Sequence, residues 1–218
     1  MPNIHAKSCP RLYPILDAGL LRARGVDLTD FAASLRAAGV EWLQYRNKQG
    51  GEAEILREAA TIRAIFTGTS TRLILNDYAH LLARTGFAGV HVGQGDLAPA
   101  AARAQIGTGA MLGVSTHTLE QALTADASDC DYIACGPVFA TTSKENPDPV
   151  IGLEGVRSIR RITSKPLVAI GGITRANCRS VIDAGADAVA VISDLLPVQG
   201  SASTAQQIAE EFLALLHS

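Results

Sequence analysis

Side chains suited to phosphate and metal binding recur along this chain. Arg46, Lys48 and Lys144 are cations that suit phosphate oxygens, the arginine through a bidentate fork and the lysines as point charges. Asp77 and Asp96 are hard oxygen donors, and such a pair suits a Mg²⁺ ion that keeps waters and binds a substrate phosphate. These residue types indicate chemistry on a phosphorylated substrate with a divalent cation.

A second set of residues suits a different phosphate. Gly171 and Gly172 let the backbone approach a ligand closely, and their amides, with Ser193 and the start of the next helix, suit a phosphate group. Three cations, one acidic pair and a separate amide site predict two phosphorylated small-molecule substrates, one of which carries a pyrophosphate group with Mg²⁺.

The elements that must position these residues are short apolar runs alternating with longer amphipathic stretches. The eight runs are residues 12–16, 40–45, 73–75, 89–92, 111–114, 132–139, 167–170 and 188–192. Most are rich in Val, Ile and Leu without strict alternation, which is typical of parallel strands covered on both faces. The amphipathic stretches have helical spacing, and the last of them, residues 205–216, can close an outer ring.

Eight β/α units without a composition break predict an α/β fold, a (β/α)8 TIM barrel that forms a single domain over residues 1–218. The alternative is an open doubly wound sheet. Such a sheet normally shows a Gly-rich phosphate turn after its first strand, and Asp17-Ala18-Gly19 is not one.

Each predicted strand after the first runs into polar residues or glycines. In a barrel these strand ends converge on one face, which is where barrel enzymes keep their chemistry. The longest such connection spans residues 140–152, and we expect it to close over the site.

Single residues also have ordinary structural explanations. An aspartate after a strand is more often a helix N-cap than a metal ligand, and Asp77 precedes a helix-like segment. A Gly-Gly pair is usually a turn. We interpret His91, inside a predicted strand, as a hydrogen-bonded core histidine, and the sequence leaves a ligand role and a structural role equally open for His117.

Composition excludes several functional classes. The net charge is −2 and no block of like charges occurs, which argues against nucleic acid or an anionic membrane as the main partner. No apolar run is long enough to span a bilayer or to form a secretory signal, and the four cysteines form no CxxC pair, so we expect a cytoplasmic protein with buried free thiols. The sequence leaves a homo-oligomer open.

Eight motifs in order give the chain a resemblance to a known family over nearly its whole length. They are YPILD (13–17), QYRNK (44–48), LILND (73–77), GVHVGQGDL (89–97), GVSTH (113–117), DYIACGPVFATTSK (131–144), AIGGIT (169–174) and AVAVIS (188–193). These motifs resemble those of the thiamine-phosphate synthases. The resemblance implies a transferase that joins a hydroxymethylpyrimidine diphosphate to a thiazole phosphate, or its carboxylated precursor, giving thiamine phosphate and pyrophosphate.

The resemblance also implies roles for individual residues. The pyrimidine-diphosphate contacts carry over to Gln44, Tyr45, Arg46, Asn47, Lys48, Asn76, Ser115 and Lys144. The thiazole-phosphate contacts carry over to Thr141, Thr142, Ser143, Gly172, Ile192 and Ser193, and the Mg²⁺ ligands to Asp77 and Asp96. The residues expected to carry the chemistry are Lys144, Arg46 and Ser115.

The mechanism implied is dissociative: pyrophosphate leaves first, the electron-rich aminopyrimidine carries the methylene cation, and the thiazole nitrogen attacks. Two positions depart from the family pattern, since Asn47 stands where Glu is common and Ser143 replaces a usual Thr. Two rival interpretations are a thiazole tautomerase on the same barrel, which should lack the pyrophosphate-binding residues, and a phosphate-binding barrel without turnover.

Overall fold

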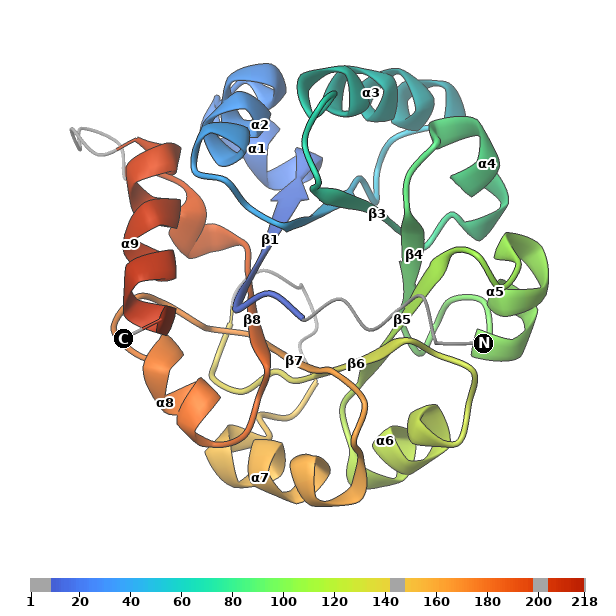
Figure 1. Ribbon diagram of the computed structural model, residues 1–218, viewed down its shortest axis with the longest axis vertical. Helices are drawn as coiled ribbons and strands as arrows, with labels where there is room; N and C mark the ends of the chain where they lie inside the picture. The colour runs from blue at the N-terminus through green and yellow to red at the C-terminus, as the bar shows by residue number, and fades with distance from the viewer. Residues whose placement is uncertain (1–8, 142–147, 198–203, 218) are drawn as a thin grey trace.

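The strands of the protein close into a barrel in chain order. The computed structural model describes residues 9–141, 148–197 and 204–217. Its strands are β1 (Leu12–Asp17), β2 (Trp42–Arg46), β3 (Arg72–Asn76), β4 (Gly89–Val92), β5 (Met111–Thr116), β6 (Tyr132–Cys135), β7 (Leu167–Ile170) and β8 (Ala188–Val191). Each strand pairs in parallel with the next, and β8 pairs with β1 (Figure 1). The barrel prediction is confirmed and the open sheet is excluded.

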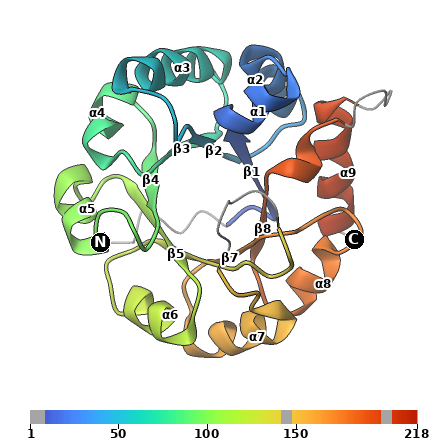
Figure 2. The same cartoon turned by 180° about the vertical axis from the view of Figure 1, so that it is seen from behind.

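Helices form a ring outside the strands, as both views along the barrel show (Figures 1 and 2). They are α1 (Ala18–Arg24), α2 (Leu28–Ala37), α3 (Glu52–Ile65), α4 (Leu82–Thr85), α5 (Pro99–Ile106), α6 (Leu119–Asp126), α7 (Gly152–Ile162), α8 (Cys178–Asp183) and α9 (Ala205–His217), with 3-10 turns η1 (Ala79–Leu81) and η2 (Ser193–Leu195). The C-terminal helix α9 lies between α8 and α2 and closes the ring (Figure 1).

Local signals set the helix ends. The side chain of Asp17 accepts a hydrogen bond from the Leu20 amide at the start of α1, and Gly25 ends that helix at φ 63°, a left-handed conformation that glycine adopts without steric cost. The Asp27 carboxylate caps α2 in the same way, accepting from the amides of Thr29 and Asp30. Two aspartates therefore begin the first two helices.

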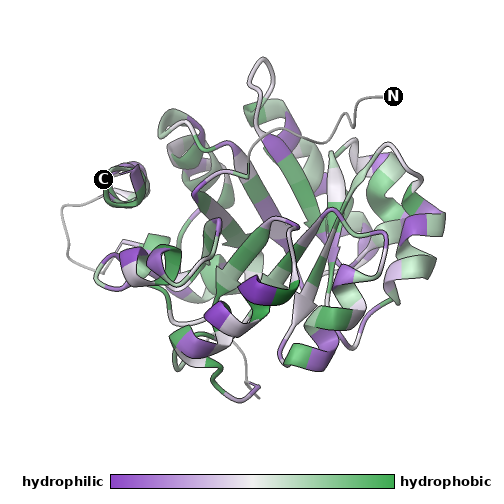
Figure 3. Cartoon of the chain, turned by 60° about the horizontal axis from the view of Figure 1, so that its bottom comes forward, coloured by the Kyte–Doolittle hydropathy of each residue, from purple (hydrophilic) through white to green (hydrophobic). Residues whose placement is uncertain are grey.

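Side chains alternate between the two faces of each strand. Leu16, Leu43 and Leu75 face outward into the large core between strands and helices. Residues at the alternate positions, such as Ile15 and Ile74, fill the barrel interior as a separate core. Figure 3 shows the strands mostly in the hydrophobic colour, while the helices carry both hydrophobic and hydrophilic residues.

An aromatic cluster fills the barrel interior near the amino-terminal ends of its strands. The ring of Tyr13 meets Trp42 edge-on at 5.4 Å between centroids, and Trp42 lies 5.2 Å from Tyr132. Gly113 makes room for this packing, because a Cβ there would lie 2.0 Å from the ring of Tyr132. The cluster leaves the polar strand residues beyond it, toward the carboxyl ends, to line a pocket.

Strand β6 ends earlier than the predicted run of residues 132–139. It stops at Cys135, because Pro137 has no N–H to donate to a strand ladder. Of the cysteines, all unpaired, Cys130, Cys135 and Cys178 are buried as predicted, whereas Cys9 is partly exposed. No helix within the described ranges is both long and apolar enough to cross a membrane.

Candidate active site

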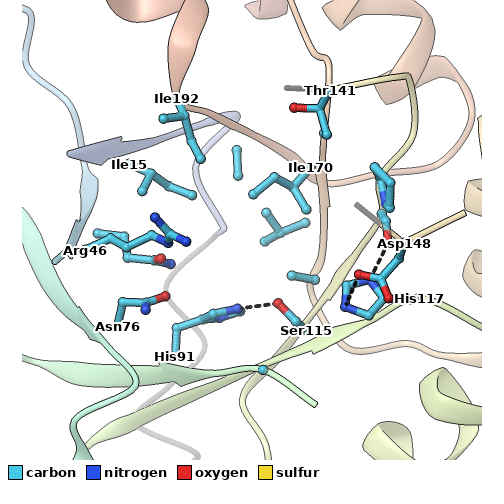
Figure 4. Close-up of a pocket in the computed structure, with 18 of the residues that line it drawn as sticks. Ile15, Arg46, Asn76, His91, Ser115, His117, Thr141, Asp148, Ile170 and Ile192 are labelled. Carbon is cyan, nitrogen blue, oxygen red and sulfur yellow. Dashed lines mark hydrogen bonds and ion pairs between the residues drawn. The ribbon is translucent and has the colours of Figure 1, made fainter. Parts of the chain in front are cut away.

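A cavity of about 370 Å³ opens among the carboxyl ends of the strands (Figure 4). Most of the residues singled out from the sequence line it. They are Gln44, Arg46, Lys48, Asn76, Asp77, Asp96, Ser115, Thr141, Gly172, Ile192 and Ser193. Thr142, Ser143 and Lys144 lie outside the described residues. The structure therefore brings together residues that are up to about 150 positions apart in the chain, as the barrel prediction requires.

The 44–48 motif divides between the two faces of its strand. Gln44, Arg46 and Lys48 line the pocket, whereas Tyr45 and Asn47 do not. This is the alternation of a strand carried two residues past the end of β2. The period-two alternation of a strand separates the two sets in the sequence, although it does not tell which set faces the pocket.

Tyr45 and Asn47 face the helix layer and hold it to β2. The Tyr45 hydroxyl donates to the Glu58 carboxylate on α3, and Asn47 Nδ2 donates to the same carboxylate at 3.0 Å. Arg22 on α1 donates to Asn47 Oδ1 at 3.2 Å. In this arrangement both side chains join α1 and α3 to the strand, and their expected contact with a pyrimidine diphosphate stays a prediction.

Arg46 is held in the pocket by a carboxylate. Its Nη1 donates to Asp17 Oδ2, while Asp17 Oδ1 accepts from the Leu20 amide. Both side chains are mostly buried, with 20% and 10% of their surface exposed. The guanidinium therefore has a fixed direction before any ligand binds.

Two carboxylates and one lysine meet at the mouth of the pocket. Lys48 Nζ lies 2.7 Å from Asp77 Oδ2 and 3.8 Å from Asp96 Oδ1. Burial and a hydrogen bond with Asp96 raise the pKa of Asp77 to about 6, although Lys48 acts in the opposite direction. Burial acts to raise the pKa of Asp96 as well, but its hydrogen bonds with Asp77 and the Gly93 amide, and the charge of Lys48, hold it below its ordinary value.

Asp77 is not a helix cap. No side chain caps the 3-10 turn η1, which follows Tyr78, and the carboxylate of Asp77 turns to Lys48 instead. Its backbone has φ 69°, the one positive φ at a non-glycine position in the described ranges. Such strain is uncommon and collects at functional sites, where the surrounding structure enforces it. Here the Asp77 amide donates to the carbonyl of His91 on β4 at 2.8 Å.

The acidic pair fits a divalent cation. Two carboxylates close enough to raise one pKa hold more negative charge than Lys48 neutralises, and a hard cation relieves that repulsion. No group of three or more His, Cys, Asp or Glu side chains that could hold a metal ion occurs in the described part of the chain. A Mg²⁺ ion held by Asp77 and Asp96 would therefore complete its shell with waters and ligand oxygens.

Asn76 contributes a donor without a protein partner. It lines the pocket with 7% of its surface exposed, and its Nδ2 is the buried side-chain polar atom in the described ranges that lacks a hydrogen bond. An unsatisfied buried donor costs on the order of 1–3 kcal/mol. A ligand oxygen or ring nitrogen would satisfy it.

The barrel interior gives the pocket an apolar part. Its lining side chains there are Ile15, Ala134, Val168, Ile170, Ala190 and Ile192, of which Ile15, Ile170 and Ile192 are labelled in Figure 4. Gly171 and Gly172, with φ 101° and 63°, follow β7 at the rim. A Cβ on Gly172 would lie 2.4 Å from the carbonyl oxygen of Ala140, so the two loops can approach this closely only with glycine there.

His117 and Asp148 are pocket residues that the sequence left open or missed. His117 Nδ1 donates to the carbonyl of Gly136 at 2.6 Å, and its Nε2 lies 3.3 Å from Asp148 Oδ2 (Figure 4). His91 is a hydrogen-bonded buried histidine, as interpreted, and it also lines the pocket. Nothing in the local sequence marks Asp148, since its partner His117 lies in another connection, directly after β5.

Comparisons with known proteins agree with one another. A family model described as thiamine monophosphate synthase matches residues 12–195. The chain is 54% identical over 211 residues to the thiamine-phosphate synthase of Koribacter versatilis, covering 96% of this chain and 97% of that protein. It is 41% identical over 198 residues to that of Chloroflexus aurantiacus, covering 91% and 90%. A thiamine phosphate pyrophosphorylase from Pyrococcus furiosus superposes with a TM-score of 0.81 and 29% identity, covering 99% and 98%.

Proposed function

This chain belongs to the thiamine monophosphate synthase family and is a transferase of thiamine biosynthesis, and we propose that it couples a hydroxymethylpyrimidine diphosphate to a thiazole phosphate. The products are thiamine phosphate and pyrophosphate. The observation that carries this proposal is that one pocket is lined both by charged side chains (Arg46, Lys48 and the acidic pair, here called the charged half) and by apolar ones (here called the apolar half).

The charged half suits a diphosphate leaving group. Arg46 offers a guanidinium whose direction Asp17 fixes, and Asn76 offers an unpaired buried donor. Pre-oriented donors stabilise charge as it develops, because they need no reorganisation during the reaction. Lys144, assigned from the sequence, would add a further cation. Ser115 is proposed to contact the pyrimidine.

Asp77 and Asp96 are proposed to hold Mg²⁺. When bound, the ion would neutralise the charge that develops on the departing pyrophosphate. The residues around this proposed ion site have two roles. Lys48 balances the acidic pair in the absence of the ion, and the Asp77 backbone, bonded to His91, keeps the carboxylate at the pocket mouth.

The apolar half suits the rings and the cationic intermediate. Ile15, Ile170 and Ile192 exclude water from the barrel side of the pocket, which would protect a methylene cation from hydrolysis until the thiazole nitrogen attacks. The thiazole phosphate is proposed to bind the Gly172 amide, Ser193 and Thr141 at the rim, together with Thr142 and Ser143.

The test is a coupling assay. Purified protein is mixed with pyrimidine diphosphate, thiazole phosphate and Mg²⁺, and pyrophosphate and thiamine phosphate are measured together. We expect both products in equal amounts, and neither without Mg²⁺ or without either substrate. In a parallel reaction with carboxythiazole phosphate as the thiazole, isomerisation without pyrophosphate release would favour a tautomerase. Binding without turnover would favour a catalytically silent barrel, and either result would overturn the proposal.

A further inference from the structure

Five polar side chains from five strands form one continuous hydrogen-bonded chain across the barrel. Gln44 Nε2 donates to the Tyr13 hydroxyl at 3.1 Å, and the hydroxyls of Tyr13 and Tyr132 lie 2.9 Å apart. His91 Nδ1 lies 3.0 Å from the Tyr132 hydroxyl, and His91 Nε2 lies 2.8 Å from Ser115 Oγ. Figure 4 shows the last of these contacts, with His91 directed at Ser115.

The middle members of this chain are buried, and Tyr13 and His91 border the same pocket that its two ends, Gln44 and Ser115, line. Tyr13, Tyr132 and His91 are buried, and the His91 ring stacks on Tyr132 with 5.6 Å between centroids. Gln44 and Ser115 both line the cavity. A change in hydrogen-bond direction at one end must therefore pass through the buried members to the other.

The donor at the first contact sets a direction for the whole chain. Gln44 supplies the first hydrogen, and the order in which each phenol accepts one hydrogen bond and donates one has the Tyr13 hydroxyl donating to Tyr132. In the same order Tyr132 donates to His91 Nδ1. Burial raises the pKa of both phenols, so each keeps its hydrogen at neutral pH.

His91 continues the same donor-to-acceptor order. A neutral imidazole has one N–H, and Nδ1 is occupied as an acceptor, so the hydrogen lies on Nε2 and is donated to Ser115 Oγ. The Ser115 hydroxyl accepts this hydrogen bond and can direct its own hydrogen into the cavity. The same positions with every hydrogen bond reversed would present an oxygen lone pair to the cavity instead.

We propose that Tyr13, Tyr132 and His91 are positioning residues that fix the Ser115 hydroxyl as a hydrogen-bond donor to the bound ligand. The ligand must therefore present an acceptor at this point. An unprotonated ring nitrogen of the pyrimidine is favoured over a phosphate oxygen, because Arg46 and Lys48 offer charged donors for the phosphates. The identity of the ligand rests on the proposed function, but the donor-to-acceptor direction of the hydrogen-bonded chain does not.

The direction is tested by the tautomer of His91. In protein labelled with ¹⁵N-histidine, long-range proton–nitrogen spectra distinguish Nδ1–H from Nε2–H, and the His91→Gln variant assigns the signals. We expect His91 of the ligand-free protein at pH 7.5 to carry its proton on Nε2. A proton on Nδ1, or an even mixture, would overturn the proposal.

The role in ligand binding is tested by removing single hydroxyl groups from this hydrogen-bonded chain. Tyr132→Phe and Tyr13→Phe each remove one relay hydroxyl, so His91 should become a mixture of tautomers. Affinity for the pyrimidine alcohol, which lacks phosphates, should fall about 10-fold, while the KM for thiazole phosphate stays unchanged. Thr116→Val is the matched control: Thr116, the neighbour of Ser115 on β5, is buried with its hydroxyl on the Ala134 carbonyl at 3.0 Å, outside the chain.

The outcomes separate this proposal from the proposed function. A loss of affinity for Mg²⁺–pyrophosphate rather than for the alcohol would support the fixed donor and assign a phosphate oxygen as its acceptor. Unchanged tautomer and unchanged affinity for both probes in folded Tyr132→Phe would refute it. If His91 carries its proton on Nε2 but the protein releases no pyrophosphate, the direction of the hydrogen-bonded chain is supported and the coupling reaction is refuted. If Tyr132→Phe does not fold, Tyr13→Phe and the wild-type tautomer still decide.

Discussion

The carboxylate of Asp17 begins a helix and holds an active-site arginine at the same time. One of its oxygens accepts from the Leu20 amide at the start of α1, and the other accepts from Arg46 in the pocket. The end of β1, the start of α1 and the end of β2 are thereby joined through a single side chain. The direction of the guanidinium depends on this charge.

Asp17→Asn should weaken binding of the diphosphate while it keeps the helix cap. Asparagine caps helices as well as aspartate does, so the fold should persist, but the charge that orients Arg46 is lost. A hydrogen bond with a charged group contributes about 1.5–3 kcal/mol, which corresponds to an increase in KM for pyrimidine diphosphate of about 10-fold or more. Steady-state kinetics measure it. Asp27→Asn, the same change at the cap of α2, should alter KM less than 2-fold, and equal effects would contradict the role of Asp17.

Asp77→Asn should change the Mg²⁺ dependence of the reaction. One of two proposed ligands loses its charge, so more Mg²⁺ is needed for half-maximal rate and turnover falls ~10²–10³-fold. Titration of pyrophosphate release against Mg²⁺ measures both effects. Asp183→Asn, at a surface carboxylate paired with Arg179, serves as the control and should leave the curve unchanged. An unaltered curve for Asp77→Asn would remove this residue from the site.

Asn76→Leu should separate stability from activity. Leucine has nearly the shape of asparagine and removes the buried donor that lacks a partner, so the free energy of unfolding should rise by about 1 kcal/mol. The KM for pyrimidine diphosphate should rise at least about 10-fold, because the ligand loses that donor. Urea unfolding and kinetics give the two values. A variant that is more stable and fully active would show that the ligand does not use Asn76.

Lys144→Ala should lower turnover ~10²–10³-fold without lowering the melting temperature. The expectation comes from the sequence alone, since this residue lies outside the described ranges. Burst-phase and steady-state measurements of pyrophosphate release test it. Near-normal kinetics would withdraw the assignment of Lys144 as a leaving-group cation.

His91 should make the protein less stable in mild acid. Burial lowers the pKa of His91 from 6.5 to about 4, with Lys48 acting in the same direction and Asp96 in the opposite one. The unfolded chain therefore binds a proton between these values that the native state does not. The stabilising contribution is complete above pH 6.5 and is lost as the pH falls toward 4, about 2 kcal/mol of it by pH 5.

The measurement is urea unfolding of wild type and His91→Gln between pH 7 and pH 5. The variant lacks this titrating group, so its stability should fall less than that of the wild type over the interval. Parallel curves for the two proteins would contradict the assignment of a buried neutral imidazole.

The barrel itself could be predicted from local patterns. Apolar runs the length of strands, separated by segments of helical period, are set by neighbouring residues, and eight of them in order leave few topologies. The ends of strands are harder to predict. The apolar run covers residues 132–139, but β6 ends at Cys135, because a proline interrupts the strand ladder inside this stretch. The motifs that carry the family resemblance likewise lie within single strands and their following loops.

Short-range order along the chain is enough to predict the fold class, the family and the placement of polar side chains at the strand ends. Which of those side chains meet depends on the three-dimensional arrangement of the strands. Tyr45 and Asn47 turn to the helices, although they stand inside a binding motif, because both faces of a barrel strand are covered and composition does not reveal which face is inner. The contact of Tyr13 with Tyr132 joins residues 119 positions apart, and that of His91 with Tyr132 spans 41. Such pairs depend on how side chains from distant strands pack inside the closed barrel, which no local pattern encodes.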